Sequence, residues 1–154
     1  MAKVTIETIK KLREHTGAGV MEAKKALEES GGDEKKAVKL INKHGLVKAE
    51  KRAEREVPEG VIASYVHHGG KIATLLELKC ETDFVARTEE FEHLSRELAM
   101  QVASMDPKNV DALLSQEYIR DPSKTIKELI AETVGKTGEK IEVKRFVRFE
   151  LGEK

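Results

Sequence analysis

Residues 61–80 read VIASYVHHGGKIATLLELKC, two apolar, β-branched runs that meet at Gly69-Gly70. Two glycines between extended runs favour a tight hairpin, because glycine adopts the positive φ angles that hairpin turns require. The second run alternates with a period of two, as does a strand with one buried face. Its inward positions are Ile72, Thr74, Leu76 and Leu78. The stretch therefore predicts an antiparallel β-hairpin against which the rest of the chain packs.

Downstream of the hairpin, the apolar period lengthens to that of a helix. Thr88 can cap a long helix, and Asp121-Pro122 has the form of a cap followed by a first-turn proline that opens a last helix. Residues 141–151 return to a strand pattern. The inward helix positions are Phe91, Leu94, Leu98, Val102 and Met105, then Ile126, Leu129, Ile130 and Val134. This order indicates an α+β fold, a small antiparallel sheet covered by helices.

Upstream of the hairpin, three short helical patterns end at glycine-rich stops. Thr5 and Asp33 can cap the first and third helices, and we expect Gly45 to interrupt the third. The expected inward residues are Ile6, Ile9, Leu12, Val20, Ala23, Leu27, Ala37, Val38 and Ile41. Three short helices with small apolar faces form a compact but marginal bundle, so we expect this bundle to dock on something else.

A charged segment separates this bundle from the hairpin. Residues 46–56 read LVKAEKRAERE, which indicates a solvated helix, and Pro58-Glu59-Gly60 breaks it. We therefore expect three parts: a three-helix docking domain at 1–45, a charged helical linker at 46–60 and an α+β core at 61–154.

Composition and charge limit the possible partners. The chain has 28 Lys and Arg against 28 Asp and Glu, and the balance divides into +4 for residues 1–56 and −4 for residues 57–154. A chain without a basic excess is not typical of a nucleic-acid-binding protein, so we expect no direct nucleic-acid contact. No apolar run reaches the roughly 20 residues of a membrane span, and no signal sequence is evident. We expect a cytoplasmic protein with no membrane contact.

No constellation of residues supports catalysis or metal binding. Cys80 is the lone cysteine and has no His or acidic partner at motif spacing, so we expect it to be a buried structural residue. His67 and His68 lie beside the expected hairpin turn, and because adjacent strand residues point to opposite faces, we do not expect the pair to share a metal. Gly135-Lys136-Thr137 lacks the earlier glycine of a phosphate-binding loop. We expect a protein that is not an enzyme and holds no cofactor.

The segment 77–87, ELKCETDFVAR, joins the second strand to the long helix. Thr82 or Asp83 can cap a short helical turn there. Phe84 then has two possible places. It can enter the core, as in an ordinary strand-to-helix connection, or it can be exposed beside Asp83 as a wedge that enters a partner's cleft.

Three stretches carry a family resemblance. Residues 12–27, LREHTGAGVMEAKKAL, closely resemble the N-terminal signature of bacterial elongation factor Ts, and residues 81–87, ETDFVAR, resemble its second signature. Residues 144–150, KRFVRFE, are similar to the closing core strand of that family. One departure is Lys79, where the family more often has Asn. The resemblance covers nearly the whole chain, whose length is that of the family's short forms with a single core half.

The resemblance implies a guanine nucleotide exchange factor of translation elongation, which makes and breaks no covalent bond. The implied partner is elongation factor Tu, first bound to GDP and then free of nucleotide, and GTP displaces the factor. The second signature implies a wedge segment that disturbs the partner's Mg²⁺ and phosphate site. This wedge segment comprises Thr82, Asp83, Phe84 and Val85. Because the family's short forms are expected to pair, the resemblance also implies a homodimer.

The first signature implies that the helical front is a ubiquitin-associated-like module that docks on elongation factor Tu. The matching docking positions are Lys10, Arg13, Val20 and Met21. In the alternative interpretation Val20 belongs to the core, and Lys10 and Arg13 are merely solvated.

Two other functions are compatible with the basic front. A ribosome- or RNA-associated binding module predicts a steep salt dependence and binding to RNA without elongation factor Tu. A ubiquitin-like adaptor is compatible with the helical front alone. Neither function accounts for residues 81–87.

Overall fold

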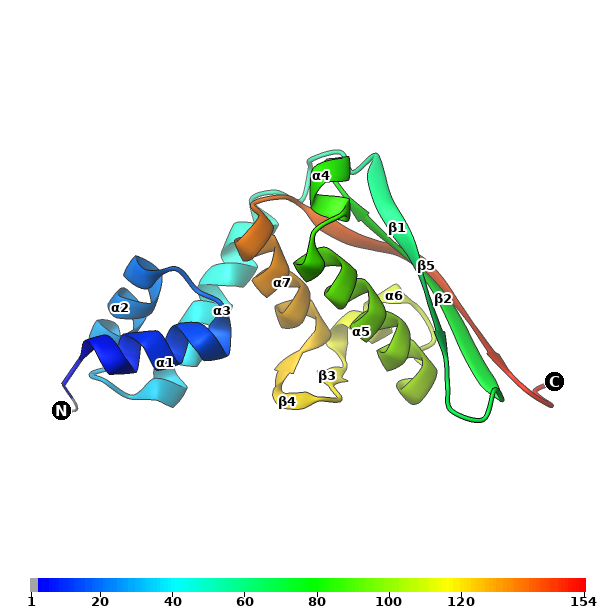
Figure 1. Cartoon of the computed structure of the whole chain (residues 1–154), viewed down its shortest axis with the longest axis horizontal. Helices are drawn as coiled ribbons and strands as arrows, with labels where there is room; N and C mark the ends of the chain where they lie inside the picture. Colours follow the sequence, from blue (N-terminus) through cyan, green and yellow to red (C-terminus); the bar gives the residue numbers. More distant parts are fainter. Residues whose placement is uncertain (1–2) are drawn as a thin grey trace.

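A computed structural model describes residues 3–154, so Met1 and Ala2 of the expected docking domain lie outside the described residues. Three helices form the front of the chain: α1 (Ile6–Thr16), α2 (Val20–Glu29) and α3 (Glu34–Glu50). Thr5 and Asp33 cap α1 and α3, as predicted. The three helices lie together at one end of the molecule (Figure 1), and they enclose a small core of their own. Its buried residues are Leu12, Ala18, Ala23, Ala26, Leu27, Ala37 and Ile41.

Three expectations about these helices are wrong, among them an inward Val20, which is 49% exposed. Gly45 does not interrupt α3, which continues to Glu50 and packs along α7 (Ile126–Thr137). A Cβ on Gly45 would lie 3.8 Å from the Cβ of Ala131, so the glycine lies at a close helix contact rather than at a helix end. Ile6 does not face inward either, because it is 86% exposed in the first turn of α1.

The predicted hairpin is confirmed. Strands β1 (Glu59–Val66), β2 (Ile72–Cys80) and β5 (Ile141–Glu150) form an antiparallel sheet in the order β1-β2-β5. Gly69 and Gly70 have φ angles of 92° and 70°. The His67 N–H closes the turn by donating to the carbonyl of Ile72 at 2.8 Å.

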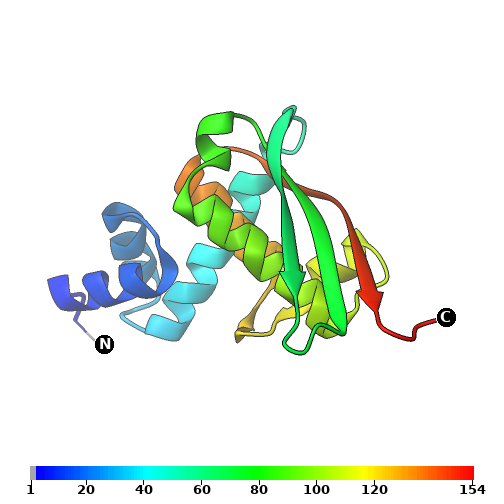
Figure 2. The ribbon, with the colours of Figure 1, turned by 45° about the vertical axis from the view of Figure 1, so that its right-hand side comes forward.

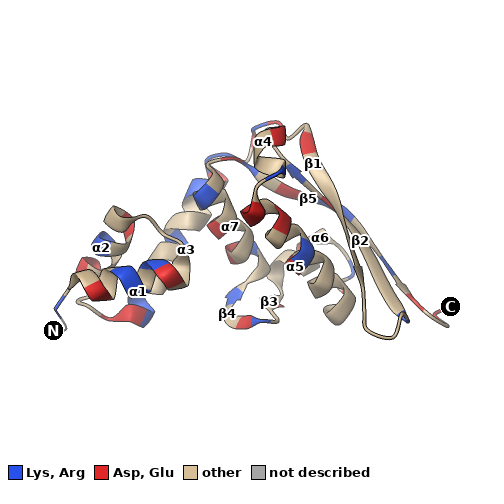
Figure 3. Ribbon diagram, in the orientation of Figure 1, with Lys and Arg blue, Asp and Glu red and all other residues tan. Residues whose placement is uncertain are grey.

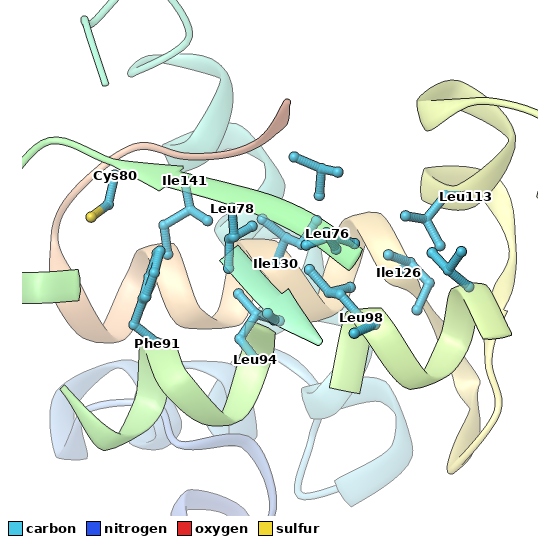
Figure 4. Packing of buried hydrophobic residues seen from close by; sticks show 14 of the residues in the cluster. Leu76, Leu78, Cys80, Phe91, Leu94, Leu98, Leu113, Ile126, Ile130 and Ile141 are labelled. Atoms are coloured by element: carbon cyan, nitrogen blue, oxygen red, sulfur yellow. The ribbon is translucent and has the colours of Figure 1, made fainter. Parts of the chain in front are cut away.

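Helices cover one face of this sheet, which confirms the predicted α+β class. Helix α5 (Glu89–Met105) begins at Thr88, as predicted, and lies with α7 on the inner face (Figures 1 and 2). Figure 4 shows the leucines of β2 directed toward side chains of these two helices. The largest buried side chains of this core include Leu76, Leu78, Phe91, Leu94, Leu98, Leu113, Ile126 and Val134. The expectation that Met105 faces inward is wrong, because this last residue of α5 is 48% exposed.

The region between α5 and β5 differs from the expectation. It contains the short helix α6 (Val110–Ser115) and a two-stranded hairpin of β3 (Glu117–Tyr118) and β4 (Asp121–Thr125). Asp121-Pro122 does not open α7, because these residues belong to β4. Thr125 caps the helix instead, in a reciprocal capping box with Glu128. The helix also passes through Gly135 and ends at Gly138, whose φ is 74°.

No described element covers the other face of the sheet. We call this the outer sheet face, and its apolar members are 41–70% exposed. They are Ile62, Val66, Leu75, Val147 and Phe149. Leu75 lies opposite Val147 in the register, and Glu77 pairs with Arg145 at 2.7 Å beside them. In residues 3–154, no helix is long and apolar enough to cross a membrane.

Candidate partner-binding site

A short helix stands where β2 ends, at residues 83–86. Helix α4 (Asp83–Ala86) begins at Thr82, whose side chain accepts a hydrogen bond from the Val85 N–H at 3.4 Å. Thr82 has extended backbone angles, as helix-capping residues do. The cap therefore sets the direction in which α4 leaves the sheet, toward the top of Figure 1.

The first turn of α4 exposes Phe84 and buries Val85. Phe84 is 80% exposed, whereas Val85 is 9% exposed and belongs to the main core. The interpretation that places Phe84 in the core is therefore wrong, and Val85 occupies that position. An exposed aromatic side chain on a short, capped turn has the form of an interface anchor.

Asp83 lies beside Phe84 and is also accessible. Its carboxylate forms an ion pair with Arg87, one turn along the chain, and about half of the Asp83 side chain is exposed. Exposed pairs of this kind contribute little to stability, so a partner can take over the carboxylate at a small cost.

The preceding residue, Thr82, is bound to a distant part of the chain. Its N–H donates to Oε1 of Glu139 at 2.9 Å, and its hydroxyl donates to Oε2 of the same carboxylate at 2.8 Å. Glu139 follows Gly138, whose left-handed conformation turns the chain out of α7. The Glu139 carboxylate thus accepts hydrogen bonds from both the N–H and the hydroxyl of Thr82, at the base of α4.

Glu81 and Lys140, the neighbours of Thr82 and Glu139, form a second contact between the same two segments, with the carboxylate now on the segment that precedes α4. The Lys140 N–H donates to Oε1 of Glu81 at 2.7 Å, and Arg55 reaches the same oxygen at 3.2 Å. The Lys140 hydrogen bond, together with Arg55, lowers the pKa of the Glu81 carboxyl. Neither Glu139 nor Lys140 was expected from the sequence. The contacts join residues 57 and 59 positions apart, and no local pattern signals such a pairing.

Cys80, the last residue of β2, is buried next to this turn. Its side chain is fully buried, and its thiol donates to the carbonyl of Thr82 at 3.1 Å. Burial, with a contribution from the nearby Glu139 carboxylate, raises the pKa of the Cys80 thiol to about 11. The thiol therefore stays protonated at neutral pH, in agreement with a structural role.

The four predicted docking residues are all exposed at the surface of α1 and α2. Val20 and Met21 are 49% and 73% exposed at the start of α2, so Val20 is not a purely core residue. Arg13 reaches this region by donating from Nε to the carbonyl of Ala18 at 3.3 Å. Lys10 lies one turn earlier on α1, 4.0 Å from Glu14.

The docking residues and the wedge segment occupy separate parts of the molecule. The start of α2 lies in the helical front and α4 stands at the end of the sheet, apart in both views (Figures 1 and 2). Both signs of charge occur along α1 (Figure 3). Within the described residues, no three His, Cys, Asp or Glu side chains gather in a way that could hold a metal ion.

Comparison with known proteins places this chain among translation factors. A family model described as "Elongation factor TS" matches residues 81–154. "Elongation factor Ts" of Thermotoga neapolitana is 44% identical in an alignment of 194 positions that covers 98% of each chain. The proteins of the same name from Thermoanaerobacter sp. and Thermodesulfovibrio yellowstonii are 39% and 41% identical, over 97% of this chain and 96% and 97% of their own lengths.

The identity therefore extends over both the helical front and the α+β core. The alignments are longer than the 154 residues of this chain, so these relatives carry positions that have no counterpart here. By this near-complete similarity, the chain belongs to the elongation factor Ts family.

Proposed function

We propose that this protein is a guanine nucleotide exchange factor of translation elongation that binds elongation factor Tu–GDP and promotes GDP release. The observation that carries the proposal is the exposed Phe84 on a turn braced at its base. This turn belongs to a segment that the family model matches. The protein weakens the binding of GDP to its partner and forms no covalent bond.

In this proposal two residues of the wedge segment contact the partner and the other two hold the turn in position. By the family resemblance, Asp83 and Phe84 enter the partner near its Mg²⁺ and phosphate site, and both side chains are accessible for such a contact. Thr82 and Val85 hold the turn in place, because one is a braced cap and the other is buried. Mg²⁺ requires near-ideal octahedral geometry, so a small displacement of its ligands weakens its binding. The diphosphate then loses part of the charge neutralisation that retains it.

Thermodynamic linkage explains how the factor leaves. A protein that weakens nucleotide binding is itself bound more weakly, by the same free energy, when nucleotide returns. GTP entering the nucleotide-free complex therefore displaces the factor.

The helical front supplies the second contact. Lys10, Arg13, Val20 and Met21 dock on the partner while the core places the wedge. A division into a docking domain at 1–45, a linker at 46–60 and a core at 61–154 is part of this proposal. Two separate clusters of buried residues support it, one within α1–α3 and one around the sheet.

A homodimer completes the proposal, with the outer sheet face as its interface. Exposed apolar patches mark interaction sites, and the sheets of two chains can pack face to face. A two-fold interface uses the same patch on both chains, so Leu75 and Val147 of one chain would pack on those of the other.

The test is the release of a fluorescent GDP analogue from elongation factor Tu. We expect the release rate to rise with the concentration of this protein and to reach a plateau. A parallel titration against RNA at increasing salt distinguishes the alternative. Unchanged GDP release, together with tight RNA binding that weakens steeply with salt, would favour the RNA-associated module.

A further inference from the structure

We propose that Glu139 is a positioning residue, which holds the wedge segment in the geometry that exchange requires. The inference rests on the proposed function and adds to it a residue outside the wedge. It is carried by the two hydrogen bonds that Thr82 donates to the two oxygens of the Glu139 carboxylate, at 2.9 and 2.8 Å.

Helix α4 is too short to hold itself in place. It has four residues, and an isolated helix of that length is unstable because nucleation costs more than its few hydrogen bonds return. The Phe84 ring does not anchor it, since that side chain is 80% exposed. The direction of Phe84 therefore depends on what holds the residues on either side of it.

Apolar and polar contacts hold the turn, and one of the polar contacts is the hydrogen bond from the Cys80 thiol to the Thr82 carbonyl. Val85 enters the core behind Phe84. In front of Phe84, Thr82 is fixed through both its N–H and its hydroxyl by Glu139. Apolar contacts are not directional and leave the turn some freedom to rotate, whereas a carboxylate that accepts two hydrogen bonds also fixes the orientation of the cap.

The loop that carries Glu139 is itself anchored on the opposite side. The Lys140 N–H bonds Glu81, and Lys140 Nζ donates to the carbonyls of Ala53 at 2.6 Å and Arg55 at 3.2 Å. The backbone next to Glu139 is therefore held in place, so its carboxylate can position Thr82. A wedge ordered in advance avoids an ordering cost when it enters the partner.

The first test compares two substitutions at this position. Glu139→Ala removes both acceptors, and we expect the maximal rate of GDP release to fall by about tenfold, as expected for two lost hydrogen bonds. Glu139→Gln keeps one carbonyl acceptor, and its amide can donate to the Thr82 hydroxyl oxygen, so it should restore most of the rate. A loss caused by charge alone would instead appear in Glu139→Gln.

Glu128 provides a matched control. It accepts the N–H of the capping residue Thr125 at 2.8 Å, as Glu139 accepts the N–H of Thr82, but it lies at the start of α7. Glu128→Ala should lower thermal stability in a similar way and leave the GDP release rate unchanged. Hydrogen exchange adds a local readout: Glu139→Ala should accelerate exchange at the amides of Thr82 and Val85, and Glu128→Ala should not.

The outcomes separate the two proposals. If the unsubstituted protein does not accelerate GDP release, the proposed function fails. If it does, and Glu139→Ala releases GDP as fast as Glu128→Ala, the positioning role is overturned. Should Glu139→Ala not fold, Glu139→Asp answers the same question, because its shorter side chain cannot reach both groups of Thr82. Unimpaired release with Glu139→Asp, together with unchanged exchange at Thr82, also overturns the inference.

Discussion

Phe84 and Val85 are consecutive residues of α4, yet Phe84 is 80% exposed and Val85 is 9% exposed. Successive residues of a helix point about 100° apart, so the cap at Thr82 decides which of the two meets the core. The turn buries the smaller side chain and presents the aromatic one to solvent. This arrangement separates stability from partner binding, and each can be tested alone.

Val85→Ala should destabilise the fold. Removing two buried methyl groups lowers the free energy of unfolding by about 1.5 kcal/mol, through lost burial and a small cavity. Phe84→Ala should change it by less than about 0.5 kcal/mol, because the ring is exposed. Urea unfolding of both variants checks the pair, and equal losses would show that the ring is packed in solution.

Met21→Ala should weaken docking without slowing the bound complex. Met21 is 73% exposed, so we expect the factor concentration at half-maximal GDP release to rise by about fivefold, at an unchanged maximal rate. Met105→Ala is the control, because Met105 is 48% exposed at the end of α5, away from the docking residues. Identical titration curves for the two variants would remove Met21 from the docking surface.

Leu75→Glu should convert a dimer into a monomer. Leu75 lies at the centre of the outer sheet face, opposite Val147, and a charge there would be buried between two sheets. Light scattering should give twice the chain mass for the unsubstituted protein and a single chain mass for the variant. Ile119→Glu, at a 45% exposed position outside the sheet, should remain dimeric. An unsubstituted protein that is monomeric and active would refute the dimer.

Cys80 should make the fold sensitive to alkaline pH. Its pKa rises from an ordinary value of 9.0 to about 11 on folding, so the unfolded chain loses this proton first. Stability is therefore complete below pH 9 and declines as the pH rises toward 11. Urea unfolding across this range should show a flatter decline for Cys80→Ala. If the free energy of unfolding falls equally with pH in both proteins, folding does not raise the pKa of the Cys80 thiol.

The elements that the sequence predicted are those with local signals. The hairpin depends on Gly69-Gly70, and the start of α5 depends on Thr88, whose side chain accepts from the Phe91 N–H three residues later. Such signals lie within a few residues and can be identified before any tertiary contact is known.

The features that escaped prediction depend on distant contacts. Pro122 suggested a helix start, but pairing with β3 places it in a strand and moves the helix start to Thr125. The contact of Thr82 with Glu139 spans 57 residues and has no local sign. The pattern of residues 81–87 also left open whether Phe84 would be buried or exposed, because the answer depends on how the cap is held.

The most direct test of the wedge is the rate of GDP release from elongation factor Tu at saturating concentrations of the unsubstituted protein and of Phe84→Ala. Saturation removes differences in affinity, so the plateau reports only what the bound factor does to the nucleotide site. We expect a high plateau for the unsubstituted protein and, for a correctly folded Phe84→Ala, a fall of at least about tenfold, since in this proposal the contact energy of the ring, about 2 kcal/mol or more, lowers the barrier to GDP release rather than tightening binding. Equal plateaus would contradict the wedge.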